Sequence, residues 1–438
     1  MNHEPLPQGF QFGLATFYLI CAGLNFGFAQ FYVTDRRLKN VWGAVGFVFL
    51  LHALLYVFTA SFTPTSAPVI PHVIVDVTNT VLNHIWGPIL YFVGSVVGFA
   101  ALLRWRKTLT HPTVAIAMMN ATLLLSGWAM TNPDFQSIIT KEDNVPIVML
   151  IFTVGFFTWL GLRRAVLNDN LIEAGKPVME KDDEKVLTWP DLVYTELICM
   201  VVATAVLVVW SVALKAPLEQ PATSAKAPNP SKAPWYFLGL QEMLVYFDPW
   251  MAGVVLPTMI IVGLCAIPYI DYNQKGNGYF TFKERSFAIS TFMFGFVVLW
   301  VVLIVLGTFL RGPNWNFFSP LENWDPHKVV PLNNVNLSDI FWLQVMGDPT
   351  KLATGVPWYM IILRELPGLV VIALYLFAIP PILAKTVFRR FYIKMGFARY
   401  FMMITLLQFM AALPIKMVLR WAFNLKYIAY IPELFLNI

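Results

Sequence analysis

The chain has 438 residues, of which 58% are hydrophobic and only 13% are charged, whereas a soluble globular protein carries about 25% charged residues. This composition excludes an ordinary soluble domain, and the 36 Phe, 16 Tyr and 15 Trp residues exclude a disordered chain. The net charge of +5 is small for this length and does not favour a nucleic-acid partner. The sequence predicts an all-α, polytopic membrane protein with about ten transmembrane helices.

The apolar runs are long enough to cross a bilayer as helices, which takes about 20 residues each. In chain order we expect spans near 11–32, 40–60, 83–103, 113–130, 145–162, 192–214, 251–270, 288–310, 366–384 and 399–419. The fourth is the weakest, because it is short and contains Asn120 and Ser126. No Lys or Arg occurs within residues 1–10, so a cleaved signal peptide with a basic start is not predicted.

The basic residues favour one orientation, since Lys and Arg accumulate in cytoplasmic loops. Most of the 30 Lys and Arg residues follow the odd-numbered spans. We therefore expect a multi-pass protein of the cell inner (cytoplasmic) membrane with both termini outside. The predicted domains are a five-helix membrane domain at 1–165, a polar cytoplasmic linker at 166–190 that contains an acidic run at 182–184, and a second membrane domain at 191–438.

The cysteines predict no metal or haem site. Cys21, Cys199 and Cys265 lie far apart within apolar runs, where cysteine packs as a small hydrophobe. No C-x-x-C occurs, so neither a c-type haem attachment nor a cysteine-rich metal site is expected.

One outer loop, at 216–250, has an unusual composition. A proline-rich stretch at 221–234 is followed by an aromatic stretch that begins at Trp235 and contains Glu242. The aromatic residues are typical of an anchor at the membrane interface. However, an ionisable group in an apolar helix is costly unless it is paired or used, so Glu242 favours a functional loop.

The residues of this loop carry a resemblance. The sequence Lys-Ala-Pro-Trp-Tyr-Phe at 232–237, after a span that begins Trp-Pro-Asp-Leu at 189–192, resembles the C-terminal domain of cytochrome b in quinol:cytochrome c oxidoreductases. It is also similar to subunit four of cytochrome bf complexes. The resemblance, which we place at about 186–420, implies that Pro234, Trp235, Tyr236 and Phe237 line a quinol-oxidation pocket on the outer side.

This sequence departs from the family at the motif's glutamate, which is replaced by Pro234. Oxidation of a quinol releases protons, and a carboxylate is a natural acceptor for one of them. Glu242, eight residues on, is the residue that we expect to take this catalytic role. Asp248 is the weaker alternative and is more typical of a turn.

The histidines do not match a di-haem cytochrome b. The family holds two b haems between four histidines, whereas this chain has six histidines and no span with two of them at a suitable spacing. His52 and His84 could hold one haem b, since axial ligands often come from neighbouring helices. The alternative is two hydrogen-bonded or pore-side histidines.

We therefore expect a subunit of a menaquinol- or other quinol-oxidising electron-transfer complex, of bc or bf type, and not a complete enzyme. It would form part of the quinol-oxidation site and help proton release. The resemblance implies as partners a di-haem cytochrome b subunit, which holds most of the haem b, an iron-sulfur protein or c-type cytochrome, and a dimeric assembly. Two alternatives stay open: a secondary transporter, and a structural membrane anchor for peripheral cytochromes.

Overall fold

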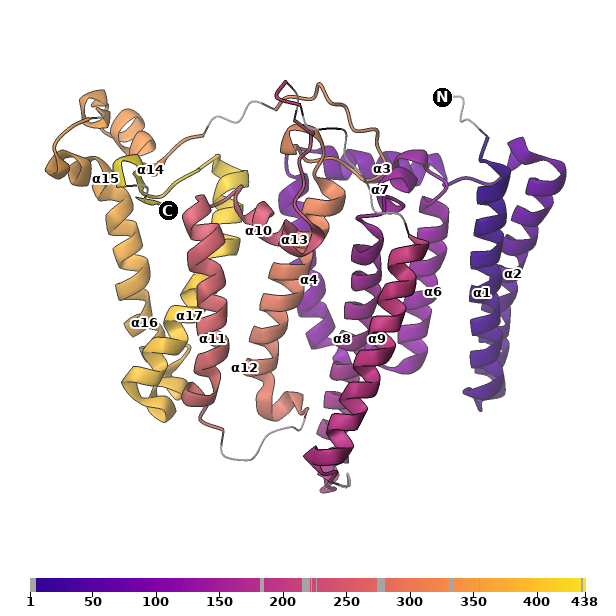
Figure 1. The fold of residues 1–438 in the computed structure, drawn as a ribbon. Coiled ribbons are helices and arrows are strands. Elements are labelled where there is room, and N and C mark those ends of the chain that lie inside the picture. The colour runs from indigo at the N-terminus through magenta and orange to yellow at the C-terminus, as the bar shows by residue number, and fades with distance from the viewer. Residues whose placement is uncertain are drawn as a thin grey trace. The chain divides into compact units, whose positions relative to one another are not determined.

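The computed structural model describes residues 5–181, 185–214, 221, 223–225, 227–273, 280–330, 334–353, 355–434 and 436–438. Within these ranges, ten helical segments are long and apolar enough to cross a membrane. The all-α prediction and the ten predicted spans are confirmed. The segments are α1 (Gln8–Phe31), α2 (Arg36–Phe62), α4 (Gly87–Arg104), α6 (Pro112–Ala129), α8 (Val145–Glu173), the stretches Thr188–Ala213, Met251–Ile270, Phe282–Leu310 and Trp358–Lys385, and α17 (Arg389–Phe423) (Figure 1).

The four composite stretches combine α-helix with wider π-helical turns. Their α-helical parts are α9 (Val193–Ala213), α11 (Leu256–Ile270), α12 (Phe282–Met293), α13 (Val302–Val305), α15 (Trp358–Ala373) and α16 (Ile379–Lys385). Their π-helical parts are η3 (Thr188–Leu192), η5 (Met251–Val255), η6 (Phe294–Val301), η7 (Leu306–Leu310) and η11 (Leu374–Ala378).

Short elements connect the spans. The short α-helices are α3 (His72–Asn83), α5 (Arg106–Leu109), α7 (Pro133–Ile139), α10 (Leu238–Met243) and α14 (Leu337–Asp339). Single turns are η1 (Pro64–Ser66), η2 (Met179–Lys181), η4 (Trp235–Phe237), η8 (Pro313–Trp315), η9 (Ile340–Val345), η10 (Pro349–Leu352) and η12 (Pro432–Leu434). Near the C-terminus, β1 (Tyr430–Ile431) and β2 (Leu436–Asn437) pair antiparallel, with Tyr430 opposite Asn437.

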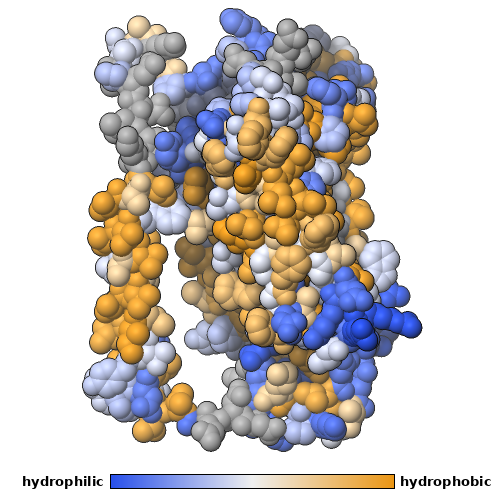
Figure 2. All heavy atoms as spheres, turned by 90° about the vertical axis from the view of Figure 1, so that its right-hand side faces the viewer, coloured by the Kyte–Doolittle hydropathy of each residue, from blue (hydrophilic) through white to orange (hydrophobic). Residues whose placement is uncertain are grey.

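The surface of the spans is apolar. On the face drawn in Figure 2, hydrophobic side chains cover the middle of the helices and hydrophilic side chains gather toward their ends. Large side chains such as Ile20 and Leu207 are more than half exposed. An apolar surface of this kind is unfavourable in water, so the chain is a multi-pass membrane protein.

The helices form two compact units. The first comprises residues 1–83, 105–163 and 318–324. In it, α1 packs along α2 around Tyr18, Phe49 and Tyr56. Asn25 of α1 and Asn120 of α6 exchange two side-chain hydrogen bonds, of 2.8 and 2.7 Å. Polar side chains inside a membrane need such partners, which explains how the weakest predicted span tolerates Asn120.

The second unit comprises residues 84–104, 164–317 and 325–438. Its core joins Phe92 of α4, Tyr246 and Phe247 after α10, Leu303 of α13 and Met417 of α17. Thus α4 packs with the C-terminal spans, although it lies within the predicted 1–165 domain. The units are defined by packing, so the sequence-based boundaries at 165 and 190 remain predictions. The acidic residues 182–184 of the predicted linker lie outside the described residues.

An ion-pair cluster attaches the C-terminal segment to α15. Arg364 is buried and donates hydrogen bonds of 3.0 and 2.9 Å to the two carboxylate oxygens of Glu433. The buried Glu365 accepts a hydrogen bond from the backbone N–H of Tyr430. The hydrogen bonds from Arg364 hold the pKa of Glu433 below its usual value, so this carboxylate stays ionised and the contact persists near neutral pH.

The same segment approaches α15 closely at Gly368. A Cβ at this position would lie 1.9 Å from the carbonyl oxygen of Ile428. Gly368→Ala is therefore expected to lower the stability by about 1–3 kcal/mol, because the backbone has to move apart. Thermal unfolding of the detergent-solubilised protein measures this loss. Gly94→Ala in α4 is the control, since a Cβ there meets nothing within 4 Å; equal losses in the two variants would contradict the prediction.

Candidate functional site

The aromatic loop begins at Pro234, which precedes η4 and α10. Proline has no N–H to donate, so it suits the start of a helical segment. The side chain of Gln241 fastens the preceding extended chain to α10: its Oε1 accepts a hydrogen bond from Ala233 N at 2.7 Å and its Nε2 donates to Ser231 O at 2.8 Å. The loop is therefore held in a fixed shape at the point where the family motif lies.

Three aromatic rings follow one another at this point. Tyr236 and Phe237 are each about half exposed, and Trp235 is partly buried. The ring centroids of Trp235 and Tyr236 are 5.7 Å apart, and those of Tyr236 and Phe237 are 4.8 Å apart. We call Trp235, Tyr236 and Phe237 the aromatic face. Exposed rings held by a rigid turn can pack against a flat apolar ligand.

Glu242, about one and a half turns beyond the aromatic face, is fully buried in a hydrogen-bonded network. Its Oε1 accepts hydrogen bonds from Arg311 Nη2 and Tyr246 Oη, both at 2.7 Å. Its Oε2 accepts from Arg311 Nε at 3.1 Å and from Trp315 Nε1 at 3.0 Å. An ionised carboxylate offers about four lone-pair sites, and all of them are used. Glu242 can therefore take a proton from a ligand only after one of these donors has moved away.

The charges of the network stabilise one another. Arg311 is buried, which acts against its positive charge, but the carboxylate of Glu242 more than compensates and raises the pKa of Arg311 above its usual value. Burial and the negative charge of Glu242 raise the pKa of Tyr246 well above 10. Tyr246 is thus a neutral hydrogen-bond donor, and Arg311 keeps its positive charge beside Glu242. We call these three residues and Trp315 the Glu242 network.

The network joins two loops that are distant in sequence. Arg311 follows η7, and its Nη1 donates to the carbonyl oxygen of Trp315 at 2.9 Å. Asn314 makes two hydrogen bonds with the side chain of Asn229 in the proline-rich stretch, at 2.9 and 2.7 Å. The part of the predicted 216–250 loop at 216–220, 222 and 226 lies outside the described residues.

Asp248 contacts the C-terminal segment of the chain. Its Oδ1 accepts long hydrogen bonds from Tyr427 Oη and Asn437 Nδ2, each at 3.4 Å. Burial, assisted by the charge of Asp248, raises the pKa of Tyr427 to about 12. Asp248 therefore connects the loop after α10 to the C-terminal segment, in keeping with the turn role that the sequence favours for it.

The two histidines considered for haem lie in different units, and each has its own environment. In the first unit, His52 Nδ1 lies 2.8 Å from Val48 O, so Nδ1–H donates and Nε2 keeps a lone pair, as an axial ligand requires. In the second unit, His84 Nδ1 accepts a hydrogen bond from Trp86 N at 3.3 Å, so a neutral ring carries its proton on Nε2. His84 as oriented does not fit an iron ligand.

We also searched for clusters of metal-ligating side chains. Among the residues that the structure describes, no group of three or more His, Cys, Asp and Glu residues could hold a metal ion. The haem expected at His52 and His84 stays a prediction, and it needs another orientation of the His84 ring.

Comparison with known families identifies the region that contains the aromatic loop. Residues 221–320 match the family model described as cytochrome b (C-terminal)/b6/petD. This stretch is therefore similar to the C-terminal region of cytochrome b. The resemblance predicted from the sequence is thereby confirmed, although the match is shorter than the 186–420 that we expected. No solved structure matches the chain.

The cytochrome b C-terminal region contains the whole aromatic face and the whole Glu242 network. Its presence in a chain with ten apolar helices supports a membrane subunit of a bc- or b6f-type quinol-oxidising complex of several subunits. The sequence singled out the aromatic face and Glu242, but not the residues that hold them in place: Gln241, Tyr246, Arg311 and Trp315. Arg311 could have been recognised from the sequence, because it directly follows the apolar stretch 288–310 and a charge at that position requires a partner.

Proposed function

We propose that the chain is the quinol-site subunit of an electron-transfer complex and that the aromatic face forms part of its quinol-oxidation site. The match of residues 221–320 to the cytochrome b family carries the proposal. The exposure of Tyr236 and Phe237 supports it, because a quinol ring needs an accessible apolar surface. The orientation derived from the basic loops puts this site on the outer side of the membrane.

The Glu242 network has two tasks in this proposal. In the arrangement described, Glu242 and Arg311 hold the aromatic face against the second outer loop. During turnover, Glu242 receives a quinol proton when Arg311 or Trp315 releases one of its oxygens. Proton transfer needs a carboxylate within hydrogen-bond reach of its donor, and α10 places Glu242 about one and a half turns beyond the aromatic face.

The partners follow from the same reasoning. We propose a di-haem cytochrome b subunit, an iron-sulfur protein or c-type cytochrome as the high-potential acceptor, a dimeric complex in the inner membrane, and menaquinol as the substrate.

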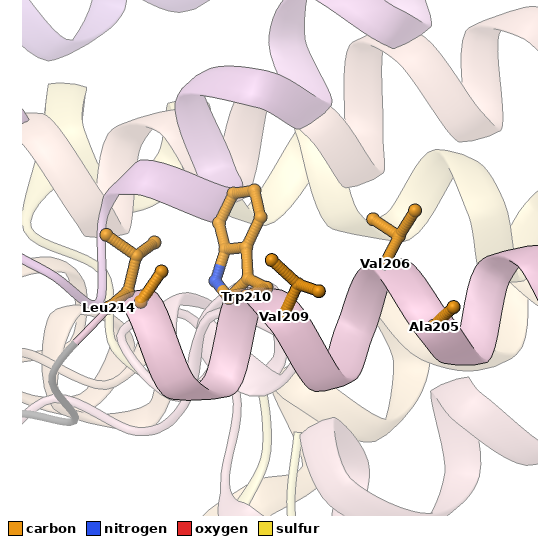
Figure 3. Close-up of a pocket in the computed structure, with 6 residues that line it drawn as sticks. Ala205, Val206, Val209, Trp210 and Leu214 are labelled. Atoms are coloured by element: carbon orange, nitrogen blue, oxygen red, sulfur yellow. The ribbon is translucent and has the colours of Figure 1, made fainter.

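The exposure of α9 supports a contact with another membrane subunit, because none of its residues is buried within the chain. Figure 3 shows Val206, Val209 and Trp210 of α9 beside an apolar hollow of about 430 Å³.

Glu242→Gln tests the proton-transfer task. The variant loses the acceptor, so we expect the rate of quinol oxidation to fall at least tenfold, in line with the contribution of a general base. The pH dependence of the rate should also change, whereas Glu242→Asp should restore part of the activity. An unchanged pH profile, in a variant whose lower activity follows only a lower amount of assembled complex, would contradict the task and leave Glu242 as a positioning residue.

A further inference from the structure

A second cavity lies at the other end of the second unit, away from the aromatic face. It has a volume of about 730 Å³ and is formed by α16 and the first turns of α17, at the lower end of these helices in Figure 1. Its apolar wall includes Phe377, Ile393, Phe397 and Phe401, all of them exposed. Lys385 and Arg389 also line it. The cavity thus combines an apolar wall with two cationic groups.

A kink in α17 shapes this cavity. Gly396 has φ +75° and ψ 176°, a backbone conformation that favours glycine. The kink lets Ile393, before it, and Phe397, after it, contribute to one wall. Tyr400 is buried and donates a hydrogen bond to the carbonyl oxygen of Pro380 at 2.8 Å, which holds α16 against α17. The cavity is therefore part of the packed fold.

The positive charge at the cavity has no acidic residue near it in the sequence. The sequence contains no Asp or Glu between Glu365 and Glu433. In the part of the chain that the structure describes, none of the ion pairs includes Lys385 or Arg389. Arg389 also begins α17, where the helix dipole disfavours a cation. Such a site favours an anionic ligand.

We propose that this cavity binds an anionic phospholipid of the adjacent leaflet. The phosphate contacts Lys385 and Arg389, and an acyl chain lies along Phe377 and Phe397. Basic pockets between transmembrane helices on the cytoplasmic side suit anionic head groups, and the basic loops place this end of the chain on that side. A neutral ligand would leave both cations unmatched. The proposal is independent of quinol oxidation.

Lipid retention measures this binding directly. The purified protein is placed in nanodiscs of phosphatidylcholine with increasing phosphatidylglycerol, and the bound phosphatidylglycerol is counted by native mass spectrometry. One site of higher affinity is expected for the unmodified chain. In Lys385→Gln/Arg389→Gln its affinity should fall roughly 30-fold, since each basic residue near an anionic lipid contributes about fivefold.

The matched control is Arg390→Gln/Lys394→Gln. It removes the same charge from the same segment, but neither residue lines the cavity. Equal losses in the two double variants would overturn the proposal and indicate diffuse attraction to anionic membranes.

Phe397→Ala separates a lipid from a free phosphate. It should weaken phosphatidylglycerol binding and leave the binding of inorganic phosphate unchanged. An unaltered lipid affinity in this variant would mean that the apolar wall holds no acyl chain, which also overturns the proposal.

Discussion

Arg311→Gln is expected to destabilise the protein by about 3–5 kcal/mol, because it leaves the buried carboxylate of Glu242 without a counter-charge. The side chains of Arg311 and Glu242 are 8% and 0% exposed, so water cannot replace the lost donor. The expected result is a lower unfolding temperature and a displaced aromatic face. Thermal unfolding of the purified protein, together with protease sensitivity of the 227–250 loop, measures both effects.

Two controls decide whether the charge is the cause. The double variant Glu242→Gln/Arg311→Gln removes both charges and should recover part of the lost stability. The pair of Asp271 with Arg285 has a similar distance, 2.6 Å, but its side chains are 30% and 29% exposed. Arg285→Gln should therefore cost no more than about 1 kcal/mol. If Arg311→Gln and Arg285→Gln cost the same, the Glu242 network is not the anchor of the loop.

Removal of a ring from the aromatic face is expected to weaken the binding of quinol. Tyr236→Ala and Phe237→Ala should each raise the KM for quinol about tenfold, because each removes apolar contact area worth more than about 1.4 kcal/mol. Stability should change little, since both rings are about half exposed. Quinol oxidation by membranes with equal amounts of the complex gives the KM.

The control for this prediction is Phe292→Ala in α12. Phe292 is 61% exposed, as a side chain that faces lipid would be, and its removal should leave the KM unchanged. If Tyr236→Ala and Phe237→Ala also leave the KM unchanged while peripheral cytochromes are lost, the aromatic face is a contact surface and the anchor function is favoured.

The spans could be predicted from the sequence because membrane insertion depends on hydropathy summed over a long window. Even the segment with Asn120 was found, although the reason that it is tolerated, the pair with Asn25, was not visible. The packing of α4 with α17 was not predictable. Hydropathy does not distinguish one apolar helix from another. Which helices pack together depends on how well their side chains fit, as with Phe92 and Trp421, whose ring centroids are 6.1 Å apart.

The site was predictable only in part. The motif at 232–237 revealed the aromatic face, and Glu242 was conspicuous as a charge among apolar residues. Its partner Arg311 is 69 residues away, and no local pattern connects positions that meet only through tertiary folding. The sequence therefore singled out Glu242 as a candidate but could not show that four donors already surround its carboxylate.

The most direct test of the central claim is purification of the chain from its native membrane in a mild detergent, followed by absorption spectra after addition of quinol. We expect a subunit with paired haem-ligand histidines and an iron-sulfur or c-type protein to be isolated with the chain in constant ratio. We also expect quinol to reduce the b haems of that complex. Isolation of the chain alone, without haem or redox partners, would contradict quinol oxidation and favour a transport function.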